Sequence, residues 1–230
     1  MRIVLDACCL AREHWSLAAR DIFTEGIHLV SGDVGSGKTT LALLLAGLLE
    51  PTSGTVRREE ITSLMVSFQY PEYHVTGMTV RDECRSWGVD PAALPANLNL
   101  AGKEDLSPMR LSRGELKRLH LACVMAGTYD LLVLDEPFSS LDCREKERVC
   151  SELSVRKKGI TIIFTHEQSC FPRVDEIWEI SNGMLHSRGR LPGALPHWEH
   201  APALVKKLIA RGKMPANISP SDLREAACRT

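Results

Sequence analysis

One stretch, GDVGSGKTT, constrains this 230-residue chain more than any other feature. It matches the pattern G-x-x-x-x-G-K-[ST], in which backbone N–H groups cradle phosphates, the lysine reaches the terminal phosphates and a hydroxyl ligates Mg²⁺. The apolar run 27–31 predicts a buried strand before the loop, and the leucine-rich run 39–49 predicts a helix after it, whose N-terminus favours an anion. This context favours a phosphate loop over an ordinary glycine-rich turn. The residues that we expect to bind the phosphates are Gly32, Asp33, Val34, Gly35, Ser36, Gly37, Lys38, Thr39 and Thr40.

Two more apolar runs each lead into polar residues. Residues 131–134 precede Asp135 and Glu136, and the β-branched run 160–165 precedes His166. Continuous apolar runs are typical of parallel strands buried on both faces, and ligands bind at the carboxyl edge of such strands. We therefore expect Asp135 to hold Mg²⁺ and Glu136 to polarise the attacking water. His166 is a candidate to bind the γ-phosphate, and an ordinary histidine at a strand end is the alternative.

The segment LSRGE at 111–115 precedes an amphipathic stretch and then the acidic strand. It resembles the signature motif of ABC ATPases, which kinases with a phosphate loop lack. In that family two nucleotide domains pack head to tail, so the resemblance implies that Ser112 and Gly114 bind the ATP held by a second chain. A hydroxyl and a backbone amide at a helix start suit an anion. Hydrolysis would then open the clamp.

Three more residues extend the resemblance. Gln69 is similar to the Q-loop glutamine, Asp142 in the triplet SLD is similar to the D-loop aspartate, and His166 is similar to the switch histidine. The motifs together span roughly residues 25–190, and the resemblance implies ATP and Mg²⁺ as cofactors. It assigns hydrolysis to Glu136, His166 and Gln69, Mg²⁺ to Thr39, Gln69 and Asp135, and a nucleotide contact to Asp142.

The resemblance also implies the fold class, which is α/β. We expect the ABC ATPase fold of P-loop NTPases, with a parallel core sheet, a small antiparallel β subdomain, a helical insertion and a short C-terminal helical extension. The expected ATPase domain is 1–192, its helical insertion is about 74–118, and the extension is 193–230. Prolines and a weak strand pattern between Gln69 and Leu111 indicate the insertion.

The expected extension contains two short helices, 202–210 and 219–227. An apolar stripe runs along the first helix and consists of Leu204, Val205, Leu208 and Ile209. The N-cap, the first-turn proline and the capping-box acid of the second helix are Ser219, Pro220 and Asp222. Two interpretations of the stripe remain open, because it is suited either to pairing with another subunit or to packing within this chain.

The segment SFQYPEY at 67–73 narrows the resemblance to energy-coupling factor (ECF) importers and related cobalt or nickel importers, and GLLEPTSG at 47–54 fits the same group. The resemblance implies an ATP-hydrolysing subunit that energises uptake of a vitamin or a transition-metal ion. Its expected partners are a second ABC ATPase chain, identical or different, and transmembrane coupling and substrate-binding subunits. The residues expected to contact a transmembrane partner, or else to pack inside the insertion, are Tyr70, Pro71, Tyr73 and His74.

Composition limits the alternatives. A net charge of −1 without a basic run argues against sequence-independent binding of nucleic acid. No segment approaches the roughly 20 apolar residues that span a bilayer, and the N-terminus lacks a signal pattern, so we expect a cytoplasmic protein that reaches the membrane through partners. Two other functions stay open: a soluble ABC ATPase acting on nucleic acid or ribosomes, and a nucleotide-gated regulatory subunit with little turnover.

Three positions depart from the family pattern. Arg113 stands where the signature motif normally has glycine, and it either points to solvent or changes how tightly the clamp closes. Glu115 replaces glutamine and adds negative charge near polyphosphate, which weakens binding unless Arg113 or Lys117 offsets it. The third departure is that the pattern does not mark the aromatic residue that stacks on adenine. The alternatives are Trp15, His14 or no aromatic residue.

Replacement of Arg113 tests its effect on closure. If the arginine impedes closure, Arg113→Gly raises the steady-state rate of ATP hydrolysis, because glycine restores the close backbone approach that the signature motif normally allows. The measurement is kcat for ATP in the wild type and the variant. Unchanged kinetics would identify Arg113 as a harmless surface residue.

Overall fold

The structure is a computed structural model that describes residues 1–93, 98, 100–156 and 158–228. Part of the expected insertion, at 94–97 and 99, and the last two residues of the expected extension therefore lie outside the described residues. The described strands are β1 (Arg2–Arg12), β2 (Trp15–Thr24), β3 (Gly26–Gly32), β4 (Ser53–Glu59), β5 (Leu64–Ser67), β6 (Leu131–Asp135), β7 (Ile160–Phe164), β8 (Glu176–Ser181) and β9 (Met184–Arg190). The described α-helices are α1 (Lys38–Ala46), α2 (Val80–Ser86), α3 (Arg113–Ala126), α4 (Cys143–Ser154), α5 (Ala203–Ala210) and α6 (Pro220–Cys228).

These strands form one curled sheet in the order β4-β1-β2-β9-β8-β3-β7-β6-β5. The strands β8, β3, β7, β6 and β5 are parallel to one another, whereas β9 pairs antiparallel with β8, and β1 pairs antiparallel with both β2 and β4. The two parts join through the single parallel pair of Ala18 in β2 with Met184 in β9. The expected parallel core and antiparallel β subdomain are thus confirmed, and they belong to one continuous sheet.

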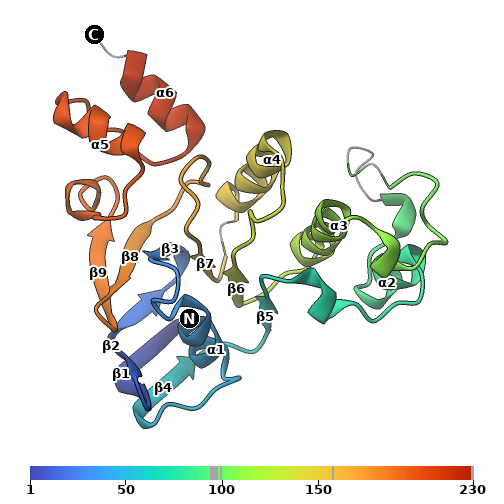
Figure 1. Cartoon of the computed structure of the whole chain (residues 1–230), viewed down its shortest axis with the longest axis horizontal. Coiled ribbons are helices and arrows are strands. Elements are labelled where there is room, and N and C mark those ends of the chain that lie inside the picture. The colour runs from blue at the N-terminus through green and yellow to red at the C-terminus, as the bar shows by residue number, and fades with distance from the viewer. Residues whose placement is uncertain (94–97, 99, 157, 229–230) are drawn as a thin grey trace.

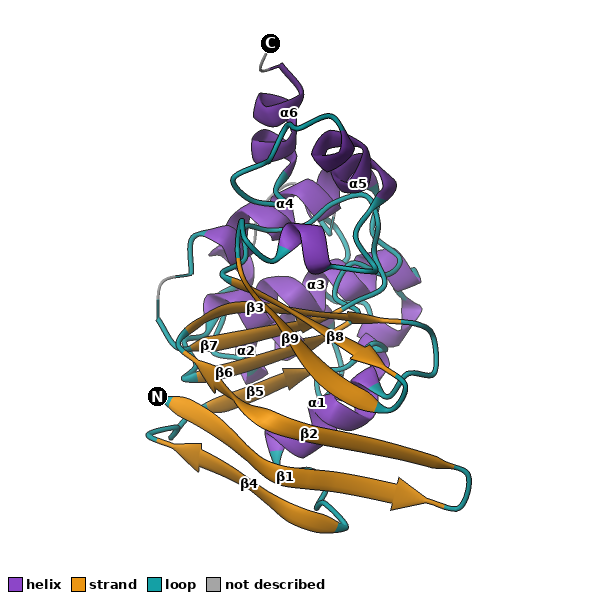
Figure 2. Ribbon diagram, turned by 90° about the vertical axis from the view of Figure 1, so that its left-hand side faces the viewer, coloured by secondary structure: helices purple, strands orange, loops and turns teal. Residues whose placement is uncertain are grey.

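The strand β6 is buried at every position because apolar layers cover both of its faces. Leu131 and Val133 face the layer formed by α1 and the antiparallel strands, whereas Leu132 and Leu134 face the layer that includes α3 and α4. Figure 2 shows α1 between the core strands and the antiparallel strands, with α3 and α4 on the opposite side. This alternation follows from the two-residue period of a strand.

Helix α1 ends earlier than the leucine-rich run predicts. The helix stops at Ala46, and Gly47 takes a left-handed conformation with φ 75° and donates its N–H to Leu43 O and Leu44 O. This is the usual glycine C-cap, in which a residue without Cβ closes the helix and satisfies its last carbonyls. Leu48 and Leu49, which the pattern assigns to the helix, follow the cap.

The C-terminal extension packs on the core through most of its apolar stripe. Val205 and Leu208 are buried, and Ile209 packs against the same cluster, but Leu204 is 51% exposed. The predicted cap of α6 is confirmed, since Asp222 N donates to Ser219 Oγ over 3.3 Å and Ser219 Oγ contacts the Asp222 carboxylate. Intrachain packing therefore accounts for the stripe apart from Leu204, and subunit pairing stays a prediction.

None of the helices in the described part of the chain is both long enough and apolar enough to cross a membrane.

Candidate nucleotide-binding and hydrolysis site

The phosphate loop runs from the end of β3 to the start of α1. Gly37 has φ 105°, which favours glycine, and the Trp15 ring occupies the space that a Cβ at Gly37 would need. Lys38 Nζ donates to the carbonyls of Gly32 at 2.7 Å and Asp33 at 2.9 Å, and burial lowers the pKa of this lysine. The loop is thus held in shape by its own lysine. Ser36 Oγ is buried without a partner among the described residues.

Asp135 ends β6 beside the first turn of α1. Its Oδ2 accepts a hydrogen bond of 2.7 Å from the Thr39 hydroxyl, and its Oδ1 is buried with no partner in the described residues. Burial raises the pKa of Asp135, as expected for a carboxylate that has lost its water and gained only one donor. An unpartnered carboxylate oxygen next to a hydroxyl is the hard oxygen donor set that Mg²⁺ binds, so these residues fit that ion.

Glu136 follows Asp135 with φ 49°, a strained conformation for a residue with a side chain. Its buried carboxylate accepts hydrogen bonds from the Thr165 hydroxyl at 3.0 Å and from the His166 N–H at 3.1 Å. The His166 ring adds a third contact, with Nδ1 2.6 Å from Glu136 Oε1, while 59% of its side chain stays exposed. Three contacts hold the carboxylate in one orientation, as a group that must orient a water requires.

These groups line one cavity of about 450 Å³. Its lining residues are Arg12, Trp15, Val34, Gly35, Gly37, Lys38, Thr39, Thr40, Gln69, Asp135, Glu136 and His166. The tertiary structure thus brings together the phosphate loop and the predicted residues from β2, β6 and the segments after β5 and β7. Gly32 and Asp33 line a neighbouring cavity instead. Trp15 reaches the nucleotide cavity and His14 is not among its lining residues.

Arg12 is a lining residue that sequence analysis missed. It pairs with Trp15 across the turn that joins β1 and β2. A guanidinium at the mouth of a phosphate site is a suitable anion-binding group. The sequence did hold a signal for Arg12. A residue that faces Trp15 across a hairpin lies at the same end of the sheet as Trp15.

Gln69 lies next to the buried Lys117 of α3. Lys117 is 1% exposed, and its Nζ donates to Gln69 O at 3.1 Å and to Phe68 O at 3.4 Å. Burial lowers the pKa of this lysine to about 8, although the nearby Asp135 and Glu136 act in the opposite direction. Lys117 therefore links the signature helix to the backbone of the Q-loop, a contact that the sequence did not reveal.

The signature segment begins α3 and is not part of the described lining of the nucleotide cavity. Ser112 caps the helix, with its N–H and hydroxyl both donating to Glu115 Oε2 at 2.9 Å. A Cβ on Gly114 would lie 3.1 Å from Ser140 O, so this glycine also permits close approach of the D-loop. Asp142 caps α4 by accepting the Glu145 N–H at 2.9 Å.

The cation beside Glu115 is one that the sequence did not indicate. Lys103 Nζ lies 2.5 Å from Glu115 Oε1, whereas Lys117 points to the Q-loop and Arg113 is exposed. Lys103, and neither of the two cations considered from the sequence, therefore offsets this charge. The Lys103 pair and the hydrogen bonds from Ser112 lower the pKa of Glu115 to about 2. Lys103 was missed because it lies in the irregular insertion, where no periodic pattern relates it to the helix.

Comparison with known proteins identifies the family of this chain. The ABC transporter family matches residues 20–139. The energy-coupling factor transporter ATP-binding protein EcfA2 of Thermotoga maritima is 29% identical over 230 residues, covering 88% of this chain and 86% of its own. EcfA2 of Geobacillus kaustophilus is 36% identical over 191 residues, covering 70% and 66%, respectively. A putative ABC transporter ATP-binding protein of Pyrococcus furiosus is 34% identical over 194 residues, covering 73% and 74%.

A solved structure shows the same fold. It is a dimeric ATP-binding cassette in a post-hydrolysis state bound to ADP and Pi, with a TM-score of 0.63 and 16% identity, and the match covers 80% of this chain and 98% of that one. The matched residues of the family include the phosphate loop, the signature segment and the acidic strand. The chain belongs to the ABC transporter family and is a nucleotide-binding ATPase subunit with the ABC ATPase fold.

The low pKa of Glu115 predicts how acid affects stability. Because the folded-state pKa of about 2 lies below the ordinary value of 4.5, the pair with Lys103 contributes stability that is present above pH 4.5 and lost as pH falls toward 2. Glutamine can keep the capping box but not the ion pair. We expect Glu115→Gln to have a lower Tm than the wild type at pH 7, with a difference that shrinks in acid. A difference independent of pH would contradict this assignment, and Lys103→Met is the matched control.

Proposed function

We propose that this chain is the ATP-hydrolysing subunit of an ECF-type importer that takes up a vitamin or a transition-metal ion. The observation that carries the proposal is the convergence of the phosphate loop, Gln69, Asp135, Glu136 and His166 on one cavity, in a chain with ECF relatives. ATP binding closes a head-to-tail dimer, and hydrolysis opens it to move the membrane subunits. Residues 1–192 form the ATPase domain in this proposal, and residues 193–230 form the extension.

The phosphate loop holds the ATP phosphates. Its backbone N–H groups and the N-terminus of α1 face the anion, and the Lys38 ammonium lies within the same cavity. Thr39, Asp135 and Gln69 are the residues that would hold Mg²⁺, and the unpartnered Asp135 Oδ1 is the feature that supports this assignment. The ion, when bound, neutralises charge that develops on the phosphates during transfer.

Glu136 positions and polarises the attacking water. A carboxylate that is already fixed by Thr165 and His166 does not have to reorganise when the water binds, which favours the transition state. The contact of His166 Nδ1 with Glu136 leaves the other ring nitrogen, Nε2, to face the γ-phosphate, and Nε2 donates to the phosphate when the ring carries both protons. Gln69 completes the group that orients water and metal.

Trp15 stacks on the adenine in this proposal. Its ring begins β2, packs directly over Gly37 and lines the same cavity as the phosphate loop. Base–aromatic stacking is worth about 1–3 kcal/mol per base in nucleic-acid complexes. Arg12 lies beside it across the hairpin and offers a positive group to the same nucleotide.

A second ABC ATPase chain completes each site. Ser112 and Gly114 face the γ-phosphate of the ATP bound to the partner, and Asp142 lies at the contact between the chains. Both segments begin helices, where backbone N–H groups favour an anion. The nucleotide cavity of one chain does not include these residues among its described lining, so a partner is required to supply them.

Membrane subunits dock beside the Q-loop. Tyr70 and Tyr73 are 43% and 73% exposed, whereas Pro71 is buried and His74 stacks on His120 at 4.3 Å between ring centroids. The two tyrosines therefore form the contact surface, and the other two residues support it from inside.

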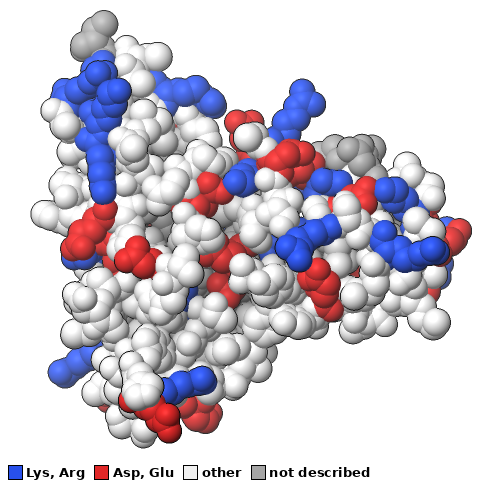
Figure 3. Space-filling view, viewed as in Figure 1, with Lys and Arg blue, Asp and Glu red and all other residues white. Residues whose placement is uncertain are grey.

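The chain is peripheral on the cytoplasmic face of the membrane. On the face shown in Figure 3, Lys and Arg alternate with Asp and Glu except over α5, and nucleic acid is not a proposed partner.

A nucleotide-gated subunit with little turnover is the second candidate. The observation that favours it is the Ser112 hydroxyl, which donates to Glu115 and so already uses the hydrogen that a γ-phosphate would accept. The kcat of the purified chain with its partner ATPase separates a motor from such a regulator.

Replacement of the water-polarising residue tests the catalytic assignment. Glu136→Gln is expected to bind ATP, to lose at least about 100-fold in kcat because general-base catalysis contributes 10²–10⁴-fold, and to accumulate a closed dimer on size-exclusion chromatography. Lys38→Ala is the control, which loses nucleotide binding and stays open. Hydrolysis by Glu136→Gln at the wild-type rate would contradict the role of Glu136.

Copurification tests the importer assignment. The tagged chain is isolated from gently solubilised membranes of its native cell, and its partners are identified by mass spectrometry. We expect polytopic membrane proteins and a second ATPase chain. Recovery of soluble nucleic-acid or ribosomal proteins alone would overturn the transport function and leave the ATPase assignment intact.

A further inference from the structure

The C-terminal extension reaches the phosphate loop through a buried carboxylate in the core sheet. Glu179 lies in β8 and is 0% exposed. Arg188 Nε lies 2.5 Å from its Oε2, and the backbone N–H groups of Glu199 and His200 donate to it at 3.1 and 2.8 Å. A buried charge needs such partners, because desolvation without them is expensive. Burial alone raises the pKa of Glu179, but the hydrogen bonds from His200 outweigh it and keep this pKa below its usual value.

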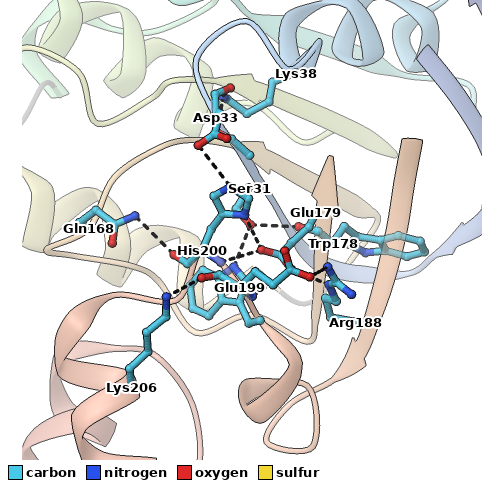
Figure 4. Close-up of polar contacts among 12 residues, drawn as sticks. Ser31, Asp33, Lys38, Gln168, Trp178, Glu179, Arg188, Glu199, His200 and Lys206 are labelled. Atoms are coloured by element: carbon cyan, nitrogen blue, oxygen red, sulfur yellow. Dashed lines mark hydrogen bonds and ion pairs between the residues drawn. The ribbon is translucent and has the colours of Figure 1, made fainter. Parts of the chain in front are cut away.

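The His200 ring lies between two carboxylates. Its Nδ1 is 2.6 Å from Glu179 Oε1, and its Nε2 is 3.4 Å from Asp33 Oδ1 in the phosphate loop. Figure 4 shows the ring between these two acids. An ionised carboxylate can only accept, so Nδ1 donates to Glu179, which fixes the ring and directs Nε2 at Asp33. Nε2 can hold the Asp33 carboxylate only as a second donor, so the ring bridges the two acids as an imidazolium.

Neighbouring contacts hold the same segment in place. Trp198 Nε1 donates to Ser31 Oγ at 2.8 Å, one residue before the phosphate loop. Gln168, in the loop after His166, donates to His200 O at 3.4 Å. Lys206 Nζ in α5 donates to Glu199 O at 2.6 Å. Trp198, Glu199 and His200 therefore form a brace between the extension, the phosphate loop and the loop that follows the switch histidine.

The Asp33 carboxylate lies outside the nucleotide cavity, on the side of the brace. Asp33 lines a separate cavity of about 210 Å³ together with Trp198 and His200, and it is not among the lining residues of the nucleotide cavity. Its side chain is 90% exposed, so burial does not hold it on that side of the loop, and its contact with His200 does. A carboxylate released beside a polyphosphate repels it.

We infer that His200 is a positioning residue for ATP binding, which holds Asp33 on the outer side of the phosphate loop and makes nucleotide affinity depend on the C-terminal extension. The inference rests on the proposed role of the phosphate loop. It concerns affinity rather than the chemical step, because His200 touches neither the nucleotide cavity nor the groups that orient water.

The experiment uses His200→Asn in the full chain. Asparagine keeps a donor near the Nδ1 position, for the bond to Glu179, and lacks the reach to Asp33. The dissociation constant of Mg-AMP-PNP is measured by calorimetry, and KM and kcat are measured with Mg-ATP. We expect the dissociation constant and KM to rise about two- to fivefold, the size of effect typical of an exposed charge pair, with kcat unchanged. Higher salt reduces the change.

Three further variants isolate the cause. His197→Asn changes an exposed histidine in the adjacent turn, Leu195–His197, and is expected to bind like the wild type. In an Asp33→Asn background, His200→Asn is expected to have no effect on affinity, because no carboxylate remains to be held. Lys38→Ala tests the phosphate loop itself and is expected to lose binding.

Two outcomes would overturn the inference. In the first, His200→Asn binds like His197→Asn while Lys38→Ala loses binding. In the second, the effect of His200→Asn persists in the Asp33→Asn background, which would make His200 a support of the fold acting through Glu179. Normal binding by Lys38→Ala would instead contradict the proposed phosphate loop.

Discussion

The structure depends on the parallel register of three buried strands. Phe164 in β7 pairs with Val30 in β3 on one side and with Asp135 in β6 on the other. This register places the start of the phosphate loop, the acidic pair and the residues after β7 at one edge of the sheet (Figure 1). Apolar layers on both faces fix the register, because a slip of one residue would turn the buried side chains of β6 to the wrong layer. The site is therefore a consequence of how the core packs.

Polar groups are placed at this edge at some energetic cost. Glu136 has a left-handed backbone, Asp135 has a buried oxygen without a described partner, and Lys117 is a buried cation. Such features are unfavourable in the absence of ligand. They are compensated by the apolar core and by contacts between distant segments, since Lys117 joins the signature helix to the Q-loop and His200 joins the extension to the phosphate loop.

Local sequence predicted the elements that carry the site because each has its own periodic or motif signal. The strand before Gly32, the acidic strand and the strand before His166 are continuous apolar runs, and the structure contains all three. The end of α1 at Ala46 was mispredicted because leucines alone do not mark a helix end, whereas Gly47 does. Partners of single charges were also missed. Lys103 lies 12 residues before Glu115, across an irregular segment, and spacing cannot relate them.

The sequence by itself determined the chemistry of this protein: the residues of the phosphate loop, the acidic pair and the signature segment are short motifs whose spacing is local. Only the tertiary structure decided which distant groups meet them. Arg12 and Trp15 reach the cavity through a hairpin, Lys103 rather than Lys117 neutralises Glu115, and His200 reaches Asp33 from the extension. The physical reason is that side-chain contacts between distant segments depend on the packing of the sheet and helices. No periodic pattern in the chain records that packing.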